Sequence, residues 1–155
     1  MILSCIIAFL LAKCDLQTRQ IPNYLVALLA VVNFAVALCQ AVAPAYGPMV
    51  SWPFTIPTPA WPFGLCINAF IFLVAVSIIV QLVSNRFHIS LIGMGDIKLM
   101  AAWMCLCDVN ALLAGIIGLG IGGLVAAVMR KSTFAAALWI SAGVLGFLLL
   151  FGGTL

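Results

Sequence analysis

Very few side chains in this 155-residue sequence can do acid–base chemistry, so each can be considered individually. The acidic residues are Asp15, Asp96 and Asp108, and the only histidine is His88. Asp15 and Asp96 each lie beside or within apolar sequence, where an ionised carboxylate is costly and is therefore a functional candidate. Two carboxyl groups that meet in a poorly solvated site share a proton, so one can act as general base on water while the other protonates a carbonyl oxygen. The pair therefore indicates hydrolysis by acid–base catalysis.

The same region also allows a structural interpretation. Asp15 and Arg19 are four residues apart, a spacing that permits an ion pair on one helix, so each carboxylate could simply lie at a membrane interface beside a cation. Gly93 and Gly95 favour the catalytic interpretation, because glycine adopts backbone conformations closed to other residues and lets another chain approach closely. His88 has no surrounding signature of a serine–histidine–aspartate site and is interpreted as an ordinary connector residue.

The composition places these residues in a membrane protein. Hydrophobic residues make up 67% of the chain and charged residues 6%, against ~45–50% and ~25% in soluble globular domains. A soluble fold of this size could not bury so much apolar surface, and a disordered chain would not contain it. The net charge of +3, with no long basic run, gives no indication of nucleic-acid binding. We expect a single integral-membrane domain over residues 1–155, with lipid as its surroundings.

Apolar segments between the charges predict an all-α polytopic bundle of about six transmembrane helices. The expected helices are residues 1–16, 22–42, 64–84, 96–106, 110–129 and 133–151. Residues 44–63 contain six of the seven prolines together with Trp and Tyr, which predicts an external interfacial loop. With the N-terminus outside, connections 13–21, 85–98 and 130–132 hold all six Lys and Arg residues. These connections, and both candidate aspartates, are therefore expected to face the cytoplasm.

The cysteines and glycines are assigned to packing. The six cysteines are expected to be buried apolar thiols rather than metal ligands or disulfides, because the chain has no CxxC pair and a single histidine. We expect no metal and no cofactor. The Gly118-x-x-x-Gly122 spacing favours close contact between helices inside the bundle over a dimer interface. Oligomerisation is still possible.

Two short motifs resemble those of a known family of membrane peptidases. Residues 15–23, Asp-Leu-Gln-Thr-Arg-Gln-Ile-Pro-Asn, are similar to the first motif of the type IV prepilin peptidases. Residues 93–99, Gly-Met-Gly-Asp-Ile-Lys-Leu, are similar to the second, GxGD followed by x-K-L. The likeness extends over about residues 4–125. The positions that match the motifs are Asp15, Arg19, Pro22, Asn23, Gly93, Gly95, Asp96 and Lys98.

The resemblance implies an aspartic endopeptidase of the inner membrane, with Asp15 and Asp96 as its catalytic pair. Its partner would be a prepilin or pseudopilin with a basic leader and an apolar helix, and its role would lie in pilus biogenesis and protein secretion. Larger family members carry a cytoplasmic insert with paired cysteines and also N-methylate the new pilin terminus. This chain has neither insert nor CxxC, so it is similar to the small peptidase-only members of tight-adherence or Flp-type systems, and methyltransferase activity is not expected.

Other classes of function stay open beside this one. A small ion or proton transporter could bind its cation with paired intramembrane carboxylates, although the lack of an internal repeat weakens that alternative. An inactive assembly subunit of a pilus or secretion system would require that either aspartate be dispensable. An archaeal-type preflagellin peptidase would share GxGD and differ in substrate rather than in class.

Overall fold

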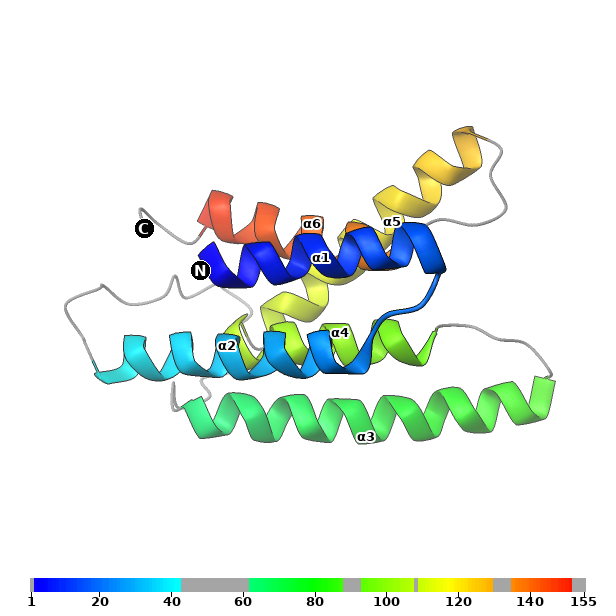
Figure 1. Ribbon diagram of the computed structural model, residues 1–155. Helices are drawn as coiled ribbons and strands as arrows, with labels where there is room; N and C mark the ends of the chain where they lie inside the picture. Colours follow the sequence, from blue (N-terminus) through cyan, green and yellow to red (C-terminus); the bar gives the residue numbers. More distant parts are fainter. Residues whose placement is uncertain (1, 43–61, 88–92, 108, 130–134, 152–155) are drawn as a thin grey trace.

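The described residues form an all-helical bundle. A computed structural model describes residues 2–42, 62–87, 93–107, 109–129 and 135–151, and within these ranges there are six helices and no strand. The helices are α1 (Ile2–Thr18), α2 (Asn23–Val42), α3 (Pro62–Phe87), α4 (Met94–Cys107), α5 (Val109–Val128) and α6 (Ala136–Phe151). The all-α part of the predicted fold class is therefore confirmed for this part of the chain (Figure 1).

Two of these helices are long and apolar enough to cross a bilayer. The most apolar 18-residue window within Phe63–Phe87 of α3 has a mean hydropathy of 2.7, and the one within Val109–Val128, which is α5, has a mean hydropathy of 2.3. Only 6% of the most apolar window of α3 is buried in the protein, and its outer face exposes Phe70, Ile71 and Ile78. An apolar surface of this kind is unfavourable in water and suits contact with lipid. The helices therefore support membrane association.

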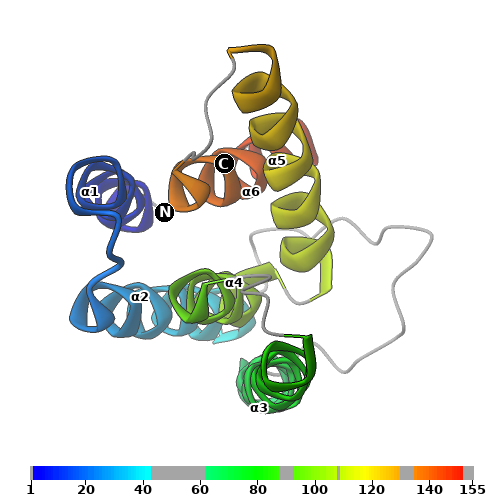
Figure 2. The same ribbon diagram turned by 90° about the vertical axis from the view of Figure 1, so that its right-hand side faces the viewer.

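Helix α4 lies at the centre of the bundle. Every residue from Leu99 to Cys107 is buried, because α2, α3, α5 and α6 all contact this helix. Figure 2 shows α4 between α2 and α3, with α1 and α6 on the side of α4 opposite α3. Helix α5 runs at a steep angle to the other helices. At 14 residues α4 is about 21 Å long. A helix surrounded by protein can be this short because its ends need not reach both membrane surfaces.

The turn between α1 and α2 ends the first helix later than the sequence indicated. Helix α1 continues to Thr18 rather than residue 16, and Arg19 follows with a φ of 56°, the single positive φ among the described non-glycine residues. The Arg19 N–H donates to the Asp15 carbonyl oxygen over 3.0 Å, which closes the helix in the αL form of C-cap. Glycine usually takes this position, and an L side chain there costs about 1 kcal/mol. The contact between Asp15 and Arg19 is thus made by the backbone.

Helix α4 begins earlier than predicted and includes the second motif. Its first residue is Met94, not residue 96, so Gly95 and Asp96 lie in the first helical turn. The N–H groups of Asp96 and Ile97 donate to the Gly93 carbonyl oxygen over 3.0 and 3.3 Å. The carboxylate of Asp96 therefore lies at the positive end of the helix dipole, which is favourable.

Some predictions concern residues outside the described ranges. The interfacial loop at 44–63, the connector residue His88 and the external Asp108 fall wholly or mostly in the undescribed part. Helix α3 runs beyond its predicted range of 64–84 at both ends. It begins at Pro62, and at its other end Asn85 and Arg86 are still helical. Helix α6 starts at Ala136 instead of residue 133.

Close packing between α5 and α6 depends on glycine. A Cβ atom on Gly118 would overlap the backbone carbonyl of Trp139, and one on Gly122 would overlap the indole ring of the same residue. From the other side, a Cβ atom on Gly143 would overlap the carbonyl oxygen of Ala114. The Gly118-x-x-x-Gly122 spacing therefore serves contact inside the bundle, as predicted.

The cysteines are less uniformly buried than predicted. All six are free, but only Cys105 and Cys107 are buried. Cys5, Cys14 and Cys66 are half-buried and Cys39 is exposed. The prediction was wrong for these four because α1, α2 and α3 form the outside of the bundle, where part of each helix faces away from the protein.

Candidate active site

Asp15 caps the start of a distant helix. It lies near the end of α1 and is 7% exposed. Its Oδ2 accepts a hydrogen bond from the backbone N–H of Ala137, in the first turn of α6, over 3.0 Å. The first N–H groups of a helix have no partner within that helix, so the carboxylate satisfies one of them and interacts favourably with the dipole of α6. This contact orients the side chain and joins the end of α1 to the start of α6.

Asp96 faces the same cavity as Asp15. The cavity has a volume of about 820 Å³ and both aspartates line it. Asp96 is half-buried, and the two carboxyl groups interact electrostatically. Figure 2 looks onto this end of the bundle, where α1 ends and α4 and α6 begin. The fold thus joins two carboxyl groups that are far apart in the sequence.

The remaining motif residues gather around the same cavity. Seven of the eight motif positions line it. The eighth is Pro22, whose carbonyl oxygen accepts hydrogen bonds from the N–H groups of Leu25 and Val26 at the start of α2. The Lys98 Nζ donates to Oδ1 of Asn23 over 2.9 Å, which joins the N-terminal part of α4 to the first residue of α2. Arg19 adds a second cation to the rim. The cavity therefore combines two carboxyl groups with two basic side chains.

The motif glycines provide room rather than an unusual backbone. Neither Gly93 nor Gly95 has a φ in the left-handed region, so the expectation that they supply a conformation closed to other residues is wrong. A Cβ atom on Gly95 would lie 3.1 Å from Cβ of Ile21, and one on Gly93 would lie 3.0 Å from Oδ2 of Asp96. Glycine leaves room here for the first turn of α4 to pack closely against the α1–α2 turn and against its own aspartate.

Sequence reasoning missed several residues of this site. Gln20, Ile21, Met94 and Ala136 line the cavity as well. Three of them lie inside or between the quoted motif positions, so their neighbourhood was a usable signal. Ala136 lies at the start of α6 and has no side-chain property that marks it. Its place follows from the hydrogen bond between the next residue and Asp15.

We expect Gly95→Val to reduce activity without reducing the amount of protein. The added methyl groups would push Ile21 and the α1–α2 turn away from α4, shifting Asp96 relative to Asp15. A displacement of about 1 Å at a catalytic group costs roughly 10²-fold in rate. The measurement is the rate of substrate processing at matched membrane abundance.

The matched control is Gly120→Val on α5, where a Cβ atom would meet nothing within 4 Å. This variant should behave like the parent protein. Gly95→Ala needs Ile21 to move by only a few tenths of an ångström and should retain most activity. Normal processing by Gly95→Val would show that this contact does not position Asp96.

No protein-family model, curated protein or solved structure matches this chain. The functional assignment therefore depends on the residues, their surroundings and the two motifs.

The chemistry available in the cavity is that of paired carboxyl groups. Among the described residues that line it there is no Ser, Thr, Cys or His to act as a nucleophile. No cluster of three His, Cys, Asp or Glu occurs in the described part of the chain, so we assign no metal-ligand set. Two carboxyl groups in one partly buried cavity can hold a water molecule between them and move protons to and from a bound substrate.

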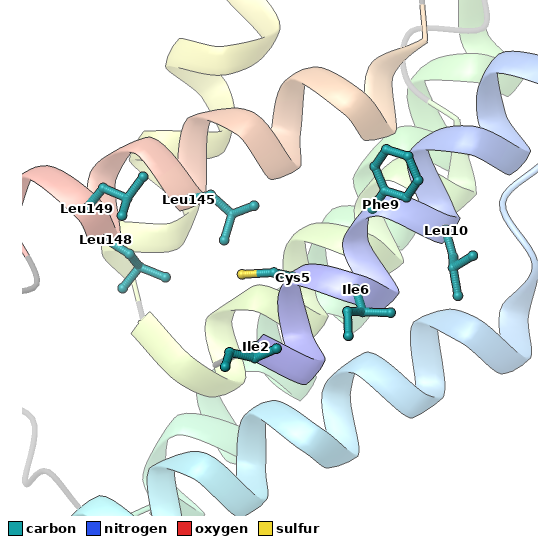
Figure 3. Close-up of a pocket in the computed structure, with 8 residues that line it drawn as sticks. All are labelled: Ile2, Cys5, Ile6, Phe9, Leu10, Leu145, Leu148 and Leu149. Carbon is teal, nitrogen blue, oxygen red and sulfur yellow. The ribbon is translucent and has the colours of Figure 1, made fainter. Parts of the chain in front are cut away.

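A second cavity offers no such chemistry. It has a volume of about 530 Å³ and lies between α1 and α6, lined by five residues from Ile2 to Leu10 and three leucines from Leu145 to Leu149 (Figure 3). Its walls are aliphatic or aromatic apart from the Cys5 thiol. Because it lacks an acid or a base, the cavity with the two aspartates is the candidate active site.

Proposed function

We propose that this protein is an intramembrane aspartic endopeptidase that removes the short basic leader from type IV, Flp-like prepilins. The observation that carries the proposal is that Asp15 and Asp96, one from each motif, line a single cavity. The basic residue of each motif and the two glycines of the second motif surround the same space. Their arrangement supports a function in which the two motifs act together.

Hydrolysis by this pair needs no covalent intermediate. One carboxylate removes a proton from water while the other carboxyl group gives its proton to the carbonyl oxygen of the scissile peptide bond. The hydroxide adds to the carbonyl carbon and gives a tetrahedral intermediate with two hydroxyl groups. As its C–N bond breaks, the leaving nitrogen takes up a proton from one aspartate and a hydroxyl of the intermediate returns its proton to the other, which restores the pair. Oδ2 of Asp15 is held by the Ala137 N–H, so the orientation of this carboxyl group is set before substrate binds.

We further propose six membrane spans with the active site at the cytoplasmic face of the inner membrane. Arg19 and Lys98 line the cavity, and Arg86 lies in the last turn of α3. Cations concentrate on the cytoplasmic side of membrane proteins. A precursor held in the membrane by its apolar helix would present its basic leader on that side.

The topology predicts a pattern of thiol labelling from outside the cell. In a cysteine-free background, Arg86→Cys and Lys131→Cys should resist a membrane-impermeant thiol reagent, while Thr55→Cys should react. The measurement is the labelled fraction in intact cells compared with permeabilised cells. External labelling of Arg86→Cys would place Asp96 on the wrong side of the membrane and would overturn the orientation.

Cleavage itself is tested by co-expression with a precursor. The precursor should carry a basic leader, a glycine at the end of the leader and then an apolar helix. We expect its mass to fall by that of the leader in cells that contain this protein, and to stay unchanged in cells without it. An intact precursor in both strains, with the protein present in the membrane, would contradict the proposal.

A further inference from the structure

Two cysteines face each other at the far end of the bundle. Cys66, near the start of α3, donates its thiol hydrogen to the sulfur of Cys105, near the end of α4, with 4.0 Å between the two Sγ atoms. The Cys105 thiol in turn donates to the carbonyl oxygen of Ala101 over 3.5 Å. Cys105 is buried, whereas Cys66 is half-buried.

The packing of α3 on α4 brings these cysteines together. A second contact joins the same helices, because the Ser77 hydroxyl donates to the sulfur of Met94 over 3.4 Å. The two contacts are eleven residues apart along each helix, as expected of antiparallel helices in one register. A disulfide needs a sulfur–sulfur distance of about 2.0 Å. Rotation of the two side chains and a small movement of α3 would therefore close the bond without changing the register.

The two thiols lie away from the aspartate cavity. Cys105 follows Asp96 by nine residues on the same helix, which corresponds to about 14 Å along its axis. Under the orientation proposed above, the aspartates face the cytoplasm and this end of α4 faces outward. The compartment outside the inner membrane is oxidising, and disulfides form and persist there. In that orientation the pair lies at the end of the bundle nearer the oxidising compartment.

We propose that Cys66 and Cys105 form a disulfide that joins α3 to α4 at the outer end of the bundle. The oxidant is a disulfide of the external compartment that reacts by exchange. The Cys66 thiolate attacks this donor disulfide, forming a mixed disulfide and releasing one donor thiolate. The Cys105 thiolate then displaces the second donor sulfur. The two cysteines lose two protons and two electrons, and the donor is reduced to two thiols.

This bond would hold α3, the helix with the least buried surface, to α4, the most buried helix. Only 6% of the apolar window of α3 is buried, whereas every residue of α4 from Leu99 onward is buried. A covalent link restricts the separation of the two helices in the unfolded chain as well. Because α4 also carries Asp96, the link would limit its movement along the bundle axis.

The test counts thiols in the protein as it exists in cells. Intact cells are quenched in acid, the protein is dissolved in detergent, and free thiols are alkylated with a polyethylene-glycol maleimide that retards the band for each thiol. The chain has six cysteines. We expect four modified thiols without prior reduction and six after reduction. Six modified thiols in both samples would overturn the proposal.

Single alanine variants identify the pair. Cys66→Ala and Cys105→Ala should each give five modified thiols whether or not the sample is reduced. The matched control is Cys107→Ala, another buried cysteine on α4, which should give three before reduction and five after. Persistence of the difference in Cys105→Ala, or its loss in Cys107→Ala, would assign the bond to another cysteine and contradict the proposal.

The disulfide rests on the proposed orientation, but its readout is independent of peptidase activity. Failure of leader cleavage would leave the thiol count unchanged. Six free thiols in a protein that cleaves its precursor would overturn the disulfide alone.

Discussion

Replacing either Asp15 or Asp96 by asparagine should abolish leader cleavage while leaving the protein in the membrane. Asparagine has nearly the same shape as aspartate and keeps an acceptor oxygen, so Asp15→Asn can still accept the hydrogen bond from Ala137 that caps α6. It cannot take up a proton or share one. General acid–base assistance contributes about 10²–10⁴-fold to a rate. A loss of that size should appear in the processed fraction of a co-expressed precursor over time.

The double variant separates catalysis from stability. Groups that act as one unit are not additive, so Asp15→Asn combined with Asp96→Asn should be little worse than either single variant. Asp108→Asn, at the third acidic residue of the chain, should retain activity and serves as the control. Partial losses that add together and follow protein abundance would instead indicate that the aspartates only anchor the helices at the membrane interface.

Gly118→Val should prevent the bundle from assembling. The new side chain would overlap the Trp139 carbonyl, and Gly143 of α6 lies directly alongside. Overpacking against backbone that cannot move aside costs about 3 kcal/mol, a large part of the stability of a small domain. We expect little membrane-inserted protein, and a loss of activity that follows the loss of protein.

Gly120→Val is the matched control for this variant. It introduces the same side chain on the same helix, but a Cβ atom at Gly120 meets nothing within 4 Å. This variant should accumulate to the parent level, as measured by the amount of protein in washed membranes. Equal amounts of Gly118→Val and Gly120→Val would show that the close α5–α6 contact is not required for folding.

The sequence predicted the helices well because apolar runs separated by a few charges leave little choice of secondary structure. It also identified the residues that the structure brings together around the cavity, from Asp15 in α1 to Lys98 in α4. The helix ends were predicted less well. The end of α1 was predicted too early. Arg19 ends this helix in a left-handed conformation, which glycine usually adopts, so the sequence carried no glycine to mark the position.

Long-range contacts account for what the sequence did not reveal. The partner of Asp15 is a backbone N–H in α6, and a backbone group has no signature in the sequence. The role of Gly95 depends on the position of Ile21, which only the packed α1–α2 turn fixes. The contact between Cys66 and Cys105 depends on the register of α3 against α4, and apolar periodicity alone does not set that register.

The most direct test of the proposed catalytic pair is the mass of the products formed from a synthetic precursor in ¹⁸O-labelled water. Purified protein in lipid vesicles is incubated with a precursor that spans the basic leader, the glycine and the apolar helix. We predict that the parent protein releases the leader with one ¹⁸O atom in its new carboxylate, because hydrolysis takes one oxygen of that carboxylate from water. Asp96→Asn should release none. An intact precursor with the folded parent protein, or release of the leader by Asp96→Asn at the parent rate, would contradict catalysis by this pair.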